Sequence, residues 1–183
     1  MVDETRELRQ GEILTNLTYY AIEPSKDNPT EVETTVGTLS YAIISTPDCD
    51  LLQDYKTRLR QGTSGLFNVL LFGAEEGRST KDRIKFNSKE WSHVVNNEMD
   101  RFHYMKSIRV DEDVRGKGLP DLVVDFRRYF TLSPQEIYRQ CLAQDPAKAY
   151  RRCRLSDLWR EDLQRRAMSY MQRVGLPDPS DAP

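Results

Sequence analysis

The spacing of apolar and polar residues predicts a chain that is rich in β-strands up to residue 130. Residues 38–46 (TLSYAIIST) are the clearest strand, because the apolar run from Tyr41 to Ile44 is typical of burial on both faces. Four further stretches show the two-residue period, or the content of β-branched and aromatic residues, that strands favour. They are residues 11–22, 66–74, 101–110 and 121–130.

Helix-start signals and the helical spacing of apolar residues predict three helices. The first follows the central strand directly, with Thr46 as its cap and Pro47 at its first position. The second begins at Pro134, because Ser133 before it is a favourable cap. The last runs from about residue 156 to residue 174, where apolar residues form one stripe and arginines the opposite side.

The segments between these elements are predicted to be less regular. Residues 23–37 contain two prolines and many polar residues, which indicates a loop or a weak hairpin. Residues 75–80 are expected to form a solvated turn, and residues 81–95 a helix or an irregular stretch. Residues 111–120 form a charged turn that contains two glycines.

Composition narrows the class of protein. The 183 residues, 38% of them apolar, suffice for one sizeable core, so one domain is expected. The 27 basic and 29 acidic residues nearly balance, which argues against a molecule that binds polyanions through its overall charge. An electrostatic partner must therefore be met by a local patch. No apolar stretch approaches the length of a membrane span.

Cysteine usage and the start of the chain bear on the compartment. Cys49, Cys141 and Cys153 are odd in number and lack the spacing of a metal site or a disulfide scaffold. No charged and then apolar leader precedes the first predicted strand. We therefore expect a protein of the reducing cytoplasm, without a cofactor.

The stretch from Ile44 to Tyr55 (ISTPDCDLLQDY) raises the question of an active site at a strand-to-helix corner. Cys49 in a first helical turn would be favoured as a thiolate by the helix dipole, but the flanking Asp48 and Asp50 oppose this. Consecutive side chains leave a helix in different directions, so they do not converge on one metal ion. The favoured interpretation is a structural corner beside a binding surface, with no metal.

The strand at residues 121–130 contains an arginine on an apolar face. Alternation places Arg128 on the same face as Val124 and Phe126, so its charge must reach past apolar neighbours. Such an arginine can pair with an acid, for which Asp48 and Asp50 are candidates, or contact a phosphate. The ion pair is the favoured alternative.

The C-terminal third of the chain is basic and aromatic. Between Arg139 and Arg173 there are nine basic residues against four acidic ones, with tyrosines and a tryptophan interleaved. This pattern is typical of a solvated helix face, but it also fits single-stranded nucleic acid or an acidic protein. The candidate partner-binding residues are Arg151, Arg152, Arg154, Trp159, Arg160 and Arg165.

Three stretches of the sequence are useful for comparison with known families: residues 11–17 (GEILTNL), 38–45 (TLSYAIIS) and 121–137 (DLVVDFRRYFTLSPQEI). Their order and content resemble the PemK/MazF-like toxin family, whose members include RNA-cleaving endoribonucleases. The resemblance implies a small SH3-like β-barrel. It also implies an Arg-Pro pair just before the central strand, where the arginine acts on the scissile phosphate; this chain has Leu39 and Ser40 there.

These observations predict an α+β protein: a small PemK/MazF-like β-barrel with inserted helices over residues 1–132, and a helical C-terminal extension over residues 133–183 that packs on it. The favoured function is a non-catalytic binding or regulatory module of a bacterial toxin–antitoxin or phage-defence system, which binds a protein partner. One alternative is an endoribonuclease that acts on single-stranded RNA, and another is a nucleic-acid binder without cleavage. The catalytic candidates for the endoribonuclease are Ser45, Asp48, Cys49, Arg128 and His103.

Overall fold

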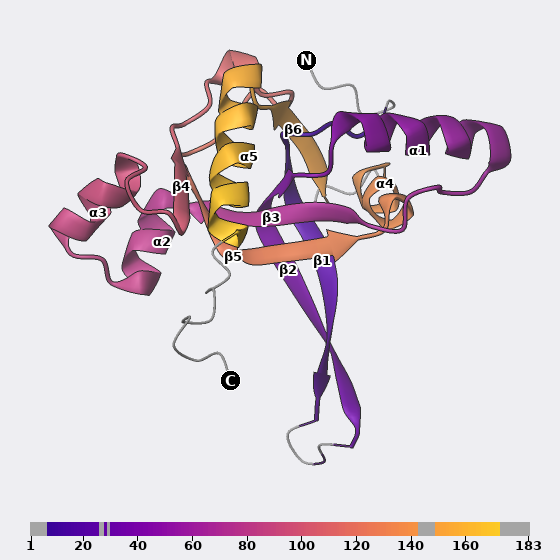
Figure 1. Ribbon diagram of the computed structural model, residues 1–183, viewed down its shortest axis with the longest axis horizontal. Coiled ribbons are helices and arrows are strands. Elements are labelled where there is room, and N and C mark those ends of the chain that lie inside the picture. Colours follow the sequence, from indigo (N-terminus) through magenta and orange to yellow (C-terminus); the bar gives the residue numbers. More distant parts are fainter. Residues whose placement is uncertain (1–6, 26–27, 29, 143–148, 173–183) are drawn as a thin grey trace, which may run out of the picture.

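A six-stranded antiparallel sheet forms the centre of the protein, as seen in a computed structural model that describes residues 7–25, 28, 30–142 and 149–172 (Figure 1). The strand order is β4-β5-β3-β2-β1-β6. The strands are β1 (Glu12–Pro24), β2 (Val32–Ile44), β3 (Val69–Glu76), β4 (Phe102–Met105), β5 (Leu122–Leu132) and β6 (Tyr150–Arg154). The helices are α1 (Asp48–Gln61), α2 (Gly77–Ile84), α3 (Ser88–Val95), α4 (Pro134–Leu142) and α5 (Asp157–Met171), with a short 3-10 turn η1 (Val110–Glu112).

The predicted α+β class is confirmed, but the predicted closed barrel is wrong. Among the described residues, β4 and β6 are the edges of the sheet and do not pair with each other. Helix α5 packs on the sheet instead, and its buried Leu163 and Ala167 join the core residues Phe72 and Phe126. Helix α5 thus covers one face of the open sheet, and no closing strand pair forms among the described residues.

Helices cover both faces of the sheet. One core cluster joins Leu51 of α1 and Ile137 of α4 to Leu14, Leu17 and other sheet residues. The cluster that contains α5 lies on the opposite face, and a third, smaller cluster packs α3 against β4. Burial on both faces explains why the central strands read as apolar runs in the sequence. Among the described residues, no helix is both long and apolar enough to cross a membrane.

Strands β1 and β2 form a hairpin that is much longer than the sequence predicts. Each has 13 residues, but β6 pairs only with residues 12–15 of β1, and β3 only with residues 41–44 of β2. The rest is a twisted two-stranded arm that projects from the body of the protein (Figure 1). Of the two alternatives predicted for residues 23–37, the hairpin is confirmed and the loop is wrong, although the hairpin is longer than expected. The β-branched residues of this segment, such as those in VETTV, favour strand pairing over the loop that its prolines suggest.

In both strands of the hairpin, the regular alternation of side chains between the two faces of the sheet is interrupted at the same height along the hairpin. Leu14 and Leu17 lie in the same core cluster, as do Ala42 and Leu39 on the partner strand, although each pair is three residues apart. Asn16 lies between them and has a left-handed backbone with φ of 57°. Because both strands shift together, their register is unchanged on either side. Two consecutive residues of each strand therefore face away from this core.

At the base of the arm, Gly37 allows the Tyr19 ring to lie across the backbone and contact the body of the protein. A Cβ atom at this position would lie within 2.6 Å of ring atoms of Tyr19, so only glycine allows the ring to lie across the backbone. The Tyr19 ring in turn contacts the ring of Phe130 on β5, with 4.7 Å between the centroids. This aromatic contact covers a glycine that would otherwise weaken the hairpin.

Strand β6 was not predicted, because the sequence pattern placed residues 133–183 in a helical extension. In the structure β6 pairs antiparallel with β1 and so extends the central sheet. Its buried residues are Arg151 and Cys153, and because the pairing shifts by one residue at Arg152, Cys153 lies in the core cluster of α5 while Arg151 lies opposite Leu14. Arg151 is 1% exposed and donates two hydrogen bonds to the equally buried Glu12, with N···O distances of 2.8 and 2.6 Å. Burial raises the pKa of Glu12, and the hydrogen bonds from Arg151 oppose that rise.

Two smaller local predictions are also corrected. Residues 75–80 do not form a solvated turn, because β3 continues to Glu76 and α2 begins at Gly77, whose amide donates to the Asp121 carbonyl. Thr46 does not cap α1: its hydroxyl accepts a hydrogen bond from the amide of Leu70 on β3 at 2.8 Å. The predicted start of α4 at Pro134 is confirmed, and the Ser133 hydroxyl accepts from the Glu136 amide.

We predict that Arg151→Ala lowers the free energy of unfolding by about 3–5 kcal/mol, because it leaves the buried Glu12 without its partner. Urea unfolding followed by circular dichroism measures this change. The double variant Glu12→Leu/Arg151→Met should recover most of the loss, since apolar residues can fill the same space. Arg165→Ala removes an exposed arginine that pairs with Asp162, and should cost less than about 1 kcal/mol. Equal costs for Arg151→Ala and Arg165→Ala would contradict the role of the buried pair.

Candidate functional site: a basic pocket beside strand β6

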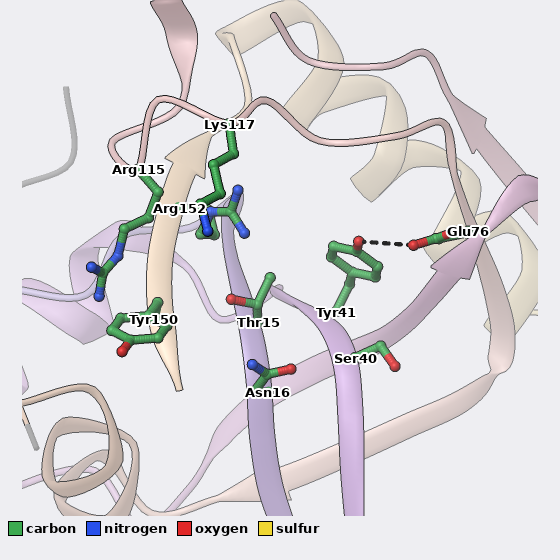
Figure 2. A pocket seen from close by; sticks show the side chains of 9 residues that line it. All are labelled: Thr15, Asn16, Ser40, Tyr41, Glu76, Arg115, Lys117, Tyr150 and Arg152. Carbon is green, nitrogen blue, oxygen red and sulfur yellow. Dashed lines mark hydrogen bonds between the residues drawn. The ribbon is translucent and has the colours of Figure 1, made fainter. Parts of the chain in front are cut away.

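A pocket of about 540 Å³ opens where β6, β1 and β2 meet the loop that follows η1. Figure 2 shows the side chains around it. They come from β1, β2, the end of β3, the loop, and β6, so no single segment of sequence defines the pocket. The lining residues are Thr15, Asn16, Ser40, Tyr41, Glu76, Arg115, Lys117, Tyr150 and Arg152.

The shifted alternation of β1 and β2 provides the polar floor of the pocket. Thr15 and Asn16 are consecutive in β1, and Ser40 and Tyr41 are consecutive in β2, yet all four line the pocket (Figure 2). In regular strands, only every second residue would face this side. The floor therefore carries twice the usual number of hydrogen-bonding side chains for two short stretches of strand.

Asp113 organises the basic side of the pocket. Its buried carboxylate accepts hydrogen bonds from the amides of Arg115 and Lys117 and from the guanidinium of Arg152, the last at 2.8 and 2.6 Å. Burial alone would raise the pKa of Asp113, but these hydrogen bonds, above all those from Arg152, outweigh it and lower the pKa to about 2. Asp113 is thus ionised at neutral pH and holds the loop to β6.

The loop itself depends on glycine at one position. Gly118 has φ of +71°, and a Cβ there would lie 2.7 Å from the carbonyl oxygen of Ile108. Its own carbonyl accepts a hydrogen bond from Arg152 at 3.0 Å. The turn therefore brings Arg115 and Lys117 toward the pocket in a conformation that other residues would strain.

Arg115 and Tyr150 form a stacked pair at one wall. The guanidinium carbon of Arg115 lies 3.5 Å from the centre of the Tyr150 ring, which is the geometry of a cation–π contact. Figure 2 shows the Arg115 side chain descending from the loop to lie over the ring. A planar guanidinium held in this way offers donors at its edge and a flat face for a further planar group.

Tyr41 and Glu76 lie on the other side of the pocket (Figure 2). The Tyr41 hydroxyl donates to the Glu76 carboxylate at 3.3 Å. Burial raises the pKa of Tyr41, and the neighbouring Glu76 adds to the rise, so the phenol stays protonated at neutral pH. Because Arg152 is paired with Asp113, the cationic side chains left for a ligand are Arg115 and Lys117, with the Glu76 carboxylate as the one acidic group that lines the pocket.

The arrangement suits a ligand that is flat and negatively charged. Two cationic side chains can contact a phosphate, while tyrosine rings and the Arg115 guanidinium can stack on a base. The hydroxyl and amide groups of the floor can form hydrogen bonds with a sugar or a base edge. The described part of the chain contains no group of three or more His, Cys, Asp or Glu residues that could hold a metal ion.

Three of the five catalytic candidates lie together at the corner that the sequence singled out. The Asp48 carboxylate accepts from the Gln10 amide and forms ion pairs with Arg154 at 2.6 Å and Arg160 at 3.2 Å. Ser45 is buried, and its hydroxyl and carbonyl accept from Gln164. Cys49 is exposed beside Asp50. These contacts tie β6 and α5 to the start of α1, as expected for a structural corner.

The other two candidates lie elsewhere. Arg128 pairs with Glu75 on the neighbouring strand β3, so its predicted pairing with Asp48 or Asp50 is wrong. His103 on β4 is fully buried beneath α5, where its ring meets those of Phe126 and Trp159. The structure thus does not bring Ser45, Arg128 and His103 into one site.

The six candidate partner-binding residues do not form one exposed face either. Arg151 is buried against Glu12, and Arg152 is held by Asp113. Arg154 and Arg160 both point to Asp48. Trp159 is 42% exposed, and Arg165 is exposed and pairs with Asp162 on the same helix.

Among the pocket residues, the sequence singled out Arg152 as a binding candidate and Tyr150 as one of the interleaved aromatic residues that could stack on nucleic acid. Lys117 and Arg115 stood in a segment predicted as a charged turn, and the glycines around them were the available signal, since RGKG places cations on a tight backbone turn. Comparison of the chain with protein-family models, with curated proteins and with solved structures gave no match.

We predict that the stability of the protein falls in mild acid because of His103. Burial lowers the pKa of His103 from 6.5 to about 4; Asp162, 3.8 Å away, opposes the shift and Arg166 adds to it. Between these pH values the unfolded chain binds a proton that the folded chain does not. The free energy of unfolding should therefore fall as the pH drops from 6.5 to 4, by about 3 kcal/mol in all, with no contribution from His103 above pH 6.5.

Urea unfolding at a series of pH values tests this prediction. In His103→Leu the fall between pH 6.5 and 4 should be smaller by most of this amount. His93→Leu removes the only other histidine and should leave the fall in place. Identical pH profiles for the native chain and His103→Leu would show that the buried imidazole is not responsible.

Proposed function

We propose that this chain is a binding module for single-stranded nucleic acid, with RNA as the ligand, and that the basic pocket receives one nucleotide. The observation that carries the proposal is the Arg115 guanidinium stacked on Tyr150 beside Lys117. Stacking surfaces combined with cations are how proteins bind single strands without strict sequence preference. The overall balance of charge makes such a local patch necessary.

The proposed roles follow from the positions of the side chains. Lys117 and the edge of the Arg115 guanidinium contact the phosphate, because among the described residues that line the pocket the cation that an acid already pairs with is Arg152. The base stacks on the exposed face of Arg115 or against Tyr41. Asn16 and Ser40 on the floor hydrogen-bond the sugar or the base edge, and the 2′-hydroxyl is the group that distinguishes RNA.

Binding without cleavage is the form of the proposal that the geometry supports best. Ser45, Arg128 and His103 are separated and engaged in other contacts, so they offer no shared acid, base and cation for an endoribonuclease. Within the pocket, Glu76 is the one carboxylate that could act as a base on a 2′-hydroxyl. An endoribonuclease that uses Glu76 is therefore the second candidate function, and it is tested in the same samples.

A relationship to PemK/MazF-like toxins is part of the proposal. Its support is the resemblance of three pieces of sequence, which fall on β1, β2 and the stretch from β5 into α4, and the fit of the pocket to RNA. The open sheet means that a shared origin would include opening of the barrel. A role in a toxin–antitoxin or phage-defence system rests on that resemblance alone.

The test is fluorescence anisotropy with a labelled single-stranded RNA. We expect binding that weakens steeply between about 50 and 200 mM salt, as phosphate contacts require. Lys117→Ala and Arg115→Ala should each weaken binding about five- to tenfold, and Lys117→Ala should reduce the salt slope by about 0.7. The matched control is Arg109→Ala, which removes an exposed arginine that pairs with Asp111 outside the pocket, and it should change the affinity less than about twofold.

Two outcomes would overturn the proposal. The first is the absence of RNA binding at low salt, or equal weakening by Arg109→Ala and Lys117→Ala. The second is RNA that is cut during the measurement, with cutting abolished in Glu76→Gln, which would establish the endoribonuclease instead. Intact RNA on a denaturing gel after incubation, with affinity retained in Glu76→Gln, is the expected result.

A further inference from the structure

The projecting arm of β1 and β2 presents an apolar face to solvent. Tyr20 lies directly across from Val36, and Pro24 from Val32, so these residues and Ile22 share one face of the ribbon. The exposed fractions of Tyr20, Ile22, Val32 and Val36 are 56%, 72%, 70% and 62%. Monomeric proteins rarely expose neighbouring large apolar side chains in this way unless they bind something.

The opposite face of the same ribbon is acidic. Glu23 and Glu33 lie directly opposite each other across the two strands, and Glu31 follows at the end of the arm. Like charges in directly opposed positions destabilise a strand pair. The arm thus contains an unfavourable charge pair on one face and unburied apolar residues on the other, and a basic and apolar partner would relieve both.

The outer edge of β2 is open. From Val32 to Ser40, β2 pairs only with β1 among the described strands, because β3 joins it only at Tyr41. The outer edge of β1 is partly covered, since Gln140 of α4 binds both the amide and the carbonyl of Thr18, each at 2.8 Å. An unpaired edge of this length is a template for a further strand.

We propose that the free edge of β2 docks an extended segment of a partner protein in which apolar residues alternate with lysine or arginine. In an added strand, successive side chains point to opposite faces of the sheet. One set would pack beside Val32 and Val36, and the other would lie beside Glu33 and its neighbour Glu23. Complementary charge on one face and apolar contact on the other select this pattern over a uniformly basic or uniformly apolar segment.

A second copy of the chain fits this surface less well. From Val32 to Ser40 this edge carries no basic residue, so a second copy docked edge to edge would bring no cation to Glu33 or Glu23. The proposal does not rest on nucleic-acid binding, because the apolar and acidic residues of the arm that it uses do not line the basic pocket.

The test uses a fluorescent peptide of about eight residues in which lysine and valine alternate, which is the length that pairs with an edge of this kind. A peptide of the same composition, with the lysines and valines grouped in two blocks, is the matched control. We expect the alternating peptide to bind with a Kd in the micromolar range and about tenfold more tightly than the grouped one. The double variant Val32→Ser/Val36→Ser should weaken that binding about tenfold, and Glu33→Gln several-fold.

Two further variants locate the peptide. Leu158→Ser changes a highly exposed leucine at the start of α5, and Lys117→Ala changes the pocket; both should leave peptide affinity within about twofold. Equal affinity for the two peptides, or unchanged affinity in Val32→Ser/Val36→Ser, would overturn the proposal. So would a dimer of the free chain in light scattering that Val32→Ser/Val36→Ser dissociates, since the occupant of the arm would then be a second copy.

Discussion

The buried ion pair between Arg151 and Glu12 determines how the last third of the chain joins the first. Arg151 is buried against Glu12, while Tyr150 and Arg152 on either side of it line the basic pocket; the pairing of β6 with β1 shifts by one residue at Arg152. A different register at Tyr150 and Arg151 would bury the pocket side chains and expose Arg151. The same interaction that fixes the register of the edge strand therefore places one wall of the pocket and the arginine that Asp113 holds.

The second constraint is the joint displacement of β1 and β2 at Asn16 and Ser40. It keeps Leu14 and Leu17 in one core cluster. Two consecutive residues of each strand then form the polar floor of the pocket. It also sets which face of the hairpin emerges from the body, because the apolar residues beyond it fall on the side away from Tyr19 and Gly37. The pocket and the face of the arm are consequences of the same local change in backbone geometry.

Sequence patterns predicted the elements that are held by apolar burial and missed those that are held by polar contacts. The apolar run from Tyr41 to Ile44 and the helix start at Pro134 are local signals, and both predictions hold. Strand β6 was missed because its buried residue Arg151 is charged, so the strand shows no alternation of apolar and polar residues. The partner of Arg151, Glu12, lies far away in the sequence. The pocket was missed for the same reason, since the link between Asp113 and Arg152 exists only after folding.

The hairpin of β1 and β2 is shared by two surfaces, and this has a thermodynamic consequence. One continuous pair of strands forms the pocket floor at one level and the exposed arm at another, with the Tyr19 ring across Gly37 between them. A ligand that changed the twist at one level would act on the other through the same ladder of backbone hydrogen bonds. Linkage then requires reciprocity: whatever factor an occupant of the arm applies to affinity in the pocket, an occupant of the pocket applies equally to the arm.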